Sequence, residues 1–155
     1  MKLFAENVLE YMDEQGLSTA NIFGYSMGGY VGMYLARHHA ERVGKVVTLA
    51  TKYHWEEAVA AKEVQMLNAE KIEQKLPAFA ATLSTRHQPN DWKEVLQLTA
   101  GMLTALGANN TLKPENHAQI TTPVMVLLGD KDKMVSLDET VAVYKVLPNA
   151  CMGVL

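Results

Sequence analysis

The sequence predicts an α/β protein built on a parallel sheet, with an all-helical segment inserted between two parts of the sheet. Short apolar runs that suit buried strands alternate with helix-patterned segments near both ends of the chain. Between these ends the apolar spacing is helical and no comparable strand run occurs. The expected organisation is a core made of residues 1–54 and 117–155, with residues 55–116 as a helical insertion.

The first part of the chain predicts a helix, a strand, a helix and a strand. Apolar residues at helical spacing predict a helix over residues 2–15, and Gly16 follows where a left-handed cap would end it. Residues 20–25 form a short apolar run between turn signals, which indicates a buried strand. Helical spacing returns over residues 27–40, and residues 45–50 then predict a second strand.

The remaining elements follow from the same patterns. Pro123 and Gly129 bound the clearest strand of the chain, and Ser136 is placed to cap a helix that ends near residue 146. A last strand begins at Cys151. Within the insertion, amphipathic spacing predicts four helices, over residues 55–75, 77–85, 91–106 and 114–118.

Composition excludes several classes of function. The chain has 155 residues, 48% hydrophobic and 20% charged, which is the usage of a folded domain. Its net charge is −3 and it has no run of Lys and Arg, so we expect no nucleic-acid partner. No apolar stretch approaches the roughly 20 residues that span a bilayer, and no signal-peptide core develops, so we expect no membrane and a cytoplasmic location. Cys151 is the single cysteine and excludes an intrachain disulfide.

The motif Gly24-Tyr25-Ser26-Met27-Gly28 matches G-x-S-x-G and lies between a predicted strand and a predicted helix. A serine at such a turn adopts a strained backbone, and we expect Gly24 and Gly28 to lie where side chains would collide. The Met27 backbone N–H begins the helix and would face an oxyanion formed above Ser26. The motif therefore predicts a nucleophile elbow, the alternative being a glycine-rich turn with an incidental serine.

The run of residues 24–29, G-Y-S-M-G-G, resembles the α/β-hydrolase superfamily, and especially its esterases and C–C-bond hydrolases. That family also has a strand ending in G-[DE]-x-D, and the segment 129–132 has this form. The resemblance implies that Asp132 is the acid of a catalytic triad, with Asp130 as the alternative, since such a carboxylate orients the catalytic histidine. It also implies that the chain is the parallel-sheet half of an α/β-hydrolase fold and that residues 55–116 are its helical cap.

The resemblance further implies that two parts of the family pattern fall outside these 155 residues. These parts are the early strands with their His-Gly oxyanion loop and the triad histidine, which is expected a few residues beyond Leu155. Among the histidines present, His54 follows a strand on the same side as Ser26 and could approach the site as a base, although a polar position in the first turn of the cap is its favoured role. The others are expected to have structural or surface positions: His38, His39, His87 and His117.

These observations predict a serine hydrolase for a small acyl substrate, in which Ser26 attacks the carbonyl and Asp132 orients a histidine. Such a reaction requires no metal and no organic cofactor. Large apolar residues could line an acyl pocket or simply pack the cap: Trp55, Met66, Trp92, Met102 and Met134. The competing hypothesis is a catalytically silent module that self-associates through the exposed edge of strand 20–25. On either hypothesis this chain alone is expected to be weakly active or inactive.

Overall fold

The computed structural model describes all 155 residues, which divide into two compact units. The first unit comprises Met1–His54 and Thr111–Leu155, and the second comprises Trp55–Asn110. Residues 111–116, which the sequence grouped with the insertion, belong to the first unit.

The first unit contains the sheet and the helices that cover it. Its N-terminal part contains α1 (Lys2–Glu14), β1 (Ala20–Tyr25), α2 (Met27–His38), the short 3-10 helix η1 (Ala40–Arg42) and β2 (Val43–Leu49). Its C-terminal part contains α7 (Pro114–His117), β3 (Val124–Leu128), α8 (Leu137–Val146) and β4 (Ala150–Val154).

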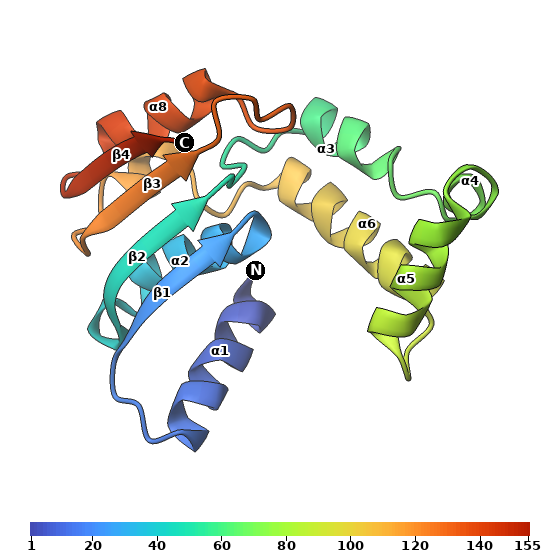
Figure 1. Ribbon diagram of the computed structural model, residues 1–155. Helices are drawn as coiled ribbons and strands as arrows, with labels where there is room; N and C mark the ends of the chain where they lie inside the picture. The colour runs from blue at the N-terminus through green and yellow to red at the C-terminus, as the bar shows by residue number, and fades with distance from the viewer. The chain divides into compact units, whose positions relative to one another are not determined.

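The four strands form one parallel sheet in the order β1-β2-β3-β4 (Figure 1), which confirms the predicted α/β class. Gly24 of β1 lies opposite Thr48 of β2, and Thr48 lies opposite Val126 of β3. Because every strand runs in the same direction, all four carboxyl ends meet at one edge of the sheet. The residues that follow β1, β2 and β3 are therefore neighbours, although they are far apart in the sequence.

The core of this unit lies between the sheet and α2. Met33 and Leu35 of α2 are almost fully buried, as are Val46 of β2 and Val126 of β3. Helix α2 comes close to the strands at Gly32, where an added Cβ would lie 3.1 Å from Ile22 and 3.3 Å from Val46. The middle of α2 therefore packs closely against the middle of β1 and β2.

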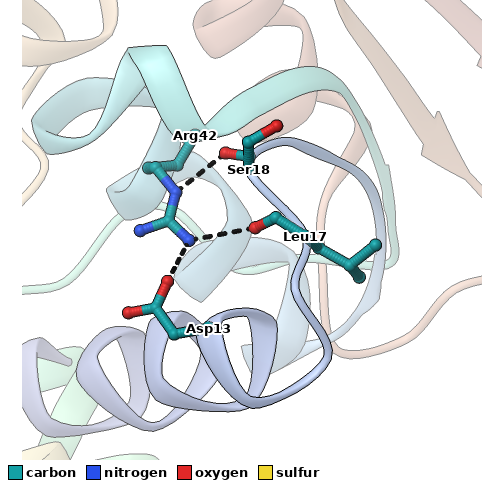
Figure 2. A network of polar contacts seen from close by, with 4 residues as sticks. All are labelled: Asp13, Leu17, Ser18 and Arg42. Carbon is teal, nitrogen blue, oxygen red and sulfur yellow. Dashed lines mark hydrogen bonds and ion pairs between the residues drawn. The ribbon is translucent and has the colours of Figure 1, made fainter.

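Arg42 ties the first helix to the sheet (Figure 2). Its Nη2 donates to Asp13 Oδ1 at 2.6 Å and to the Leu17 carbonyl at 3.1 Å, and its Nε donates to the Ser18 carbonyl at 2.9 Å. The guanidinium therefore satisfies groups at the end of α1 and in the turn before β1. This fixes the path of the chain into β1, which leads to Ser26.

The second unit is entirely helical and contains α3 (Glu57–Val64), α4 (Ala69–Lys75), α5 (Pro77–His87) and α6 (Trp92–Ala108). Helices α3 and α6 approach closely at Gly107, where an added Cβ would lie 2.4 Å from Ala60. Helices α4, α5 and α6 meet in a small core of Ile72, Ala80 and Trp92. No helix of either unit combines the length and the apolar character that crossing a membrane requires.

Several expected elements have different bounds in the structure, and one of them is divided. The helix predicted over residues 55–75 is two helices, because the Asn68 side chain accepts the Lys71 N–H and begins a new helix. The second strand begins at Val43 and ends at Leu49, and Ala50 leaves the sheet with φ 51°. The predicted caps at the other boundaries are confirmed: Gly16 has φ 66°, and Ser136 accepts the Glu139 N–H.

Candidate active site

Ser26 lies between the last residue of β1 and the first residue of α2, with φ 52° and ψ −120°. A positive φ is rare for a residue other than glycine and indicates a strained backbone. Two hydrogen bonds hold the turn: Ser26 N–H donates to the Leu49 carbonyl at 2.8 Å, and Gly29 N–H donates to the Ser26 carbonyl at 3.1 Å. The strained strand-to-helix turn that the motif predicted is therefore present.

The glycines around Ser26 differ in how much space a side chain would have at each of them. A Cβ at Gly24 would lie 2.4 Å from backbone atoms of Gly28 and Gly29, so the expectation for Gly24 is confirmed. The expectation for Gly28 is wrong, because a Cβ there meets no atom within 4 Å. Gly29, which follows the motif, is constrained as well, since a Cβ there would lie 2.0 Å from the hydroxyl oxygen of Thr51.

The Ser26 side chain is exposed, and the helix that follows it has no side-chain cap. The N–H groups of the first turn of a helix have no partner within the helix and carry the positive end of its dipole. Met27 is the first residue of α2 and supplies the first of these N–H groups after Ser26. The turn can therefore favour negative charge that develops beside Ser26.

The loop after β2 contacts the serine turn directly. Thr51 is 2% exposed, and its hydroxyl donates to the Ser26 carbonyl at 3.0 Å. None of the sequence motifs points to Thr51. The signal that could have found it is Gly29, which leaves room for a group arriving from elsewhere in the chain.

The same loop is fastened to the segment that follows β3. Glu139, in the first turn of α8, accepts N–H groups from Tyr53 at 2.6 Å and from His54 at 2.7 Å. Lys52 Nζ donates to the Met134 carbonyl at 2.8 Å. The loop of residues 50–54 is therefore hydrogen-bonded on one side to the serine turn and on the other to the residues around the candidate acid.

Asp132 lies in the turn after β3 and is partly buried. Its Oδ1 accepts N–H groups from Met134 at 2.8 Å and from Val135 at 2.9 Å, which orients the carboxylate. Asp130 is more exposed, and its carboxylate lies 3.7 Å from Lys131 Nζ. The fixed carboxylate at the carboxyl end of β3 is thus that of Asp132.

Ser26 and Asp132 follow strands that are separated in the sheet by β2 alone. Two strand spacings of about 4.8 Å place the ends of β1 and β3 about 10 Å apart. The serine turn and the turn that holds Asp132 therefore begin at the same edge of the sheet, with one strand between them.

The histidines occupy different environments. His38 and His39 lie at the far end of α2, about 15 Å or more from Ser26 at 1.5 Å per residue, as expected. Desolvation, assisted by Arg37 and His39, lowers the pKa of His38. His54 is exposed at the carboxyl end of β2, on the same edge of the sheet as Ser26. His87 ends α5 in the second unit.

His117 is the last residue of α7 and is 2% exposed. Its ring packs edge-on against Tyr53, with centroids 5.6 Å apart, and neither ring nitrogen has a hydrogen-bond partner of ordinary geometry. Burial lowers the pKa of His117 to about 4, although the nearby Leu112 backbone opposes part of that shift. His117 is therefore a neutral core residue at ordinary pH.

The apolar residues named as pocket candidates are also divided between the units. Trp92 is buried in the small core of the second unit, so packing is its role there. Met66 in the second unit and Met134 in the first are 53% and 60% exposed. Across both units, no group of three or more His, Cys, Asp or Glu side chains is arranged to hold a metal ion.

The chain belongs to the alpha/beta hydrolase fold family, whose sequence profile matches residues 3–154. A solved hydrolase from Pseudomonas aeruginosa has the same fold, with a TM-score of 0.67 and 23% identity over 97% of this chain. The enol-lactonase from Burkholderia xenovorans superposes with a TM-score of 0.65 and 20% identity over 99% of this chain. A putative carbamate hydrolase, RutD, from Caulobacter segnis is 38% identical over 45 residues, 29% of this chain.

The chain is shorter than these relatives. It covers 62% of the Pseudomonas hydrolase, 64% of the enol-lactonase and, in the aligned segment, 17% of the carbamate hydrolase. The likeness to the solved structures, at these identities, concerns the fold.

Proposed function

We propose that this chain carries the nucleophile and the acid of a serine hydrolase that acts on a carboxylic ester or a related acyl substrate. The observation that carries the proposal is the strained, exposed Ser26 at the start of α2, on the same edge of the sheet as the oriented carboxylate of Asp132, with one strand between the two. A nucleophile, an anion-stabilising helix start and a carboxylate at this spacing suit acyl transfer.

In the proposed reaction the Ser26 hydroxyl attacks the acyl carbonyl while a histidine takes its proton. The Met27 N–H stabilises the oxyanion that forms, and Asp132 holds the imidazolium. The histidine then returns the proton to the leaving group, and water releases the acyl group from Ser26. None of these steps uses a metal ion or an organic cofactor.

The base in this proposal is a histidine that these 155 residues do not supply, and His54 is the alternative within them. His54 is favoured over the other four because it lies at the carboxyl edge of the sheet. The helical unit, with the segment up to residue 116, is proposed to cap the Ser26 edge and to contribute apolar surface for the acyl group. The carbamate hydrolase among the similar proteins is consistent with a substrate that has an acyl carbonyl.

A fluorophosphonate probe tests the nucleophile. We expect labelling of the wild-type chain at Ser26 and none in Ser26→Ala, as read by peptide mass spectrometry. If His54 is the base, Asp132→Asn should slow labelling, whereas Asp130→Asn, which changes a neighbouring exposed carboxylate, should not. With no base among these residues, neither aspartate variant should change the labelling rate. Equal labelling of wild type and Ser26→Ala would contradict the proposal, and a reversed order of the two aspartate variants would reassign the acid.

Turnover tests the base. Without a complete triad, oxyanion stabilisation and positioning leave only about 10³–10⁴-fold acceleration over water. We therefore expect very slow hydrolysis of p-nitrophenyl acetate by the chain alone. Hydrolysis at ordinary enzymatic rates, lost in both Ser26→Ala and His54→Ala, would identify His54 as the base instead.

A second candidate function, a self-associating module, is favoured by the edge of the sheet at β1. This strand ends the sheet order, and its Phe23 and Tyr25 are 65% and 66% exposed. An open strand edge with large apolar side chains favours pairing with another copy of the chain. Sedimentation should then give a dimer that Phe23→Lys converts to a monomer, while Leu98→Lys in the second unit has no effect. A wild-type monomer at all concentrations would contradict this candidate.

A further inference from the structure

Thr51 makes an unusual contact for a residue in a loop. It is almost fully buried, and its hydroxyl donates to the Ser26 carbonyl at 3.0 Å. That carbonyl also accepts the Gly29 N–H at 3.1 Å. The oxygen therefore has two donors, one from within its own turn and one from the loop after β2.

The Ser26 carbonyl and the Met27 N–H are the two ends of one planar peptide group. A hydrogen bond to the oxygen fixes the plane of that group and, through polarisation of the amide, strengthens the N–H as a donor. We propose that Thr51 is a positioning residue that orients and polarises the Met27 N–H as an oxyanion donor. This inference rests on the proposed function of Ser26 as the nucleophile.

The surroundings of Thr51 support this role because they hold the hydroxyl in place. Gly29 leaves room for it, since any side chain there would overlap the Thr51 oxygen. The loop beyond it is anchored by Glu139, which accepts the N–H groups of Tyr53 and His54. A β-branched side chain also has few rotamers, so Thr51 loses little freedom in making the contact.

Three variants separate positioning from general stability. Thr51→Val keeps the shape of the side chain and removes the hydroxyl, and Thr51→Ser restores the hydroxyl. Thr99→Val is the matched control, because the Thr99 hydroxyl also donates to a backbone carbonyl, at 2.7 Å, in the second unit. Thr51→Ala removes the same hydroxyl without placing a methyl group beside Gly29, and it replaces Thr51→Val if that variant does not fold.

The first measurement is the initial rate of fluorophosphonate labelling at Ser26. Loss of one hydrogen bond of ordinary strength should lower this rate about fivefold in Thr51→Val. Thr51→Ser should recover most of the loss, and Thr99→Val should label at the wild-type rate. The second measurement is the Met27 amide resonance in a ¹H–¹⁵N spectrum, which should move upfield in Thr51→Val and in neither of the other variants.

The two measurements keep the inference distinct from the function on which it rests. Wild-type labelling no faster than that of Ser26→Ala would refute the proposed nucleophile, and the Met27 amide would still decide whether Thr51 polarises the peptide group. An unchanged Met27 amide in Thr51→Val overturns the inference. So does wild-type labelling of Thr51→Val when Ser26→Ala is not labelled.

Discussion

Replacing Gly24 with alanine tests the packing of the serine turn. The added Cβ would lie 2.4 Å from three backbone atoms, the Gly28 carbonyl carbon and oxygen and the Gly29 nitrogen. Carbon atoms in favourable contact are about 3.5–4.0 Å apart, so each of the three overlaps is more than about 1 Å. Because all three atoms belong to backbone, no side-chain rotation can relieve them, and the start of α2 must move away from β1.

The expected cost follows from this geometry. Overpacking of a rigid site destabilises by about 1–3 kcal/mol, and a clash with backbone alone belongs at the upper end, about 3 kcal/mol. For a chain of this length, each kcal/mol lowers the melting temperature by about 2–4 °C. Gly24→Ala should therefore lower the melting temperature by about 6–12 °C. Labelling of Ser26 should fall as well, since the turn that presents it is displaced.

Gly28→Ala is the matched control for this experiment. It adds the same methyl group four residues later in the same motif, where no atom lies within 4 Å. Alanine is favoured over glycine in helices, by up to about 1 kcal/mol, and Gly28 is the second residue of α2. Its melting temperature, followed by circular dichroism, should be unchanged or slightly higher. Equal losses in the two variants, or no loss in Gly24→Ala, would refute the reasoning.

Three further predictions concern stability. Arg42→Ala removes the bonds to the end of α1 and should lower the free energy of unfolding in urea by about 1–2 kcal/mol, with Arg42→Lys recovering only part. His117 has a folded pKa of about 4 against an ordinary 6.5, so the folded state binds fewer protons and stability should fall as pH drops from about 6.5 towards 4. The pKa shift corresponds to about 3 kcal/mol of stability. Between pH 6.5 and 4 the free energy of unfolding should therefore fall more steeply with pH in the wild type than in His117→Phe. An equal pH dependence in the two proteins would contradict the assignment. Tyr53→Phe should lower the stability measured in a thermal melt by about 1–3 kcal/mol, because the fully buried Thr48 hydroxyl loses its hydrogen-bond partner at 2.6 Å. Unchanged stability would show that another group replaces the Tyr53 hydroxyl.

The order of helices and strands could be predicted because it depends on neighbouring residues. Periodic apolar residues define α1 and α2, and the run before Ser26 defines β1 with the bounds that the structure has. Ser136 and Gly16 were informative for the same reason, since a cap acts within one helical turn. The break at Asn68 was missed because the apolar spacing continues across it, and only the side-chain cap shows where one helix ends and another begins.

What the sequence by itself determined is the class of fold and the identity of the candidate nucleophile and acid, since both motifs are local and lie at strand ends. The tertiary structure alone decided that Gly29 is constrained and Gly28 is not, because the group that fills the space beside Gly29 is Thr51, which lies in the loop after β2. It also decided that His117 is a neutral core residue. The physical reason is the same in both cases: parallel pairing brings together loops that no sequence spacing relates, and burial depends on everything that packs around a side chain.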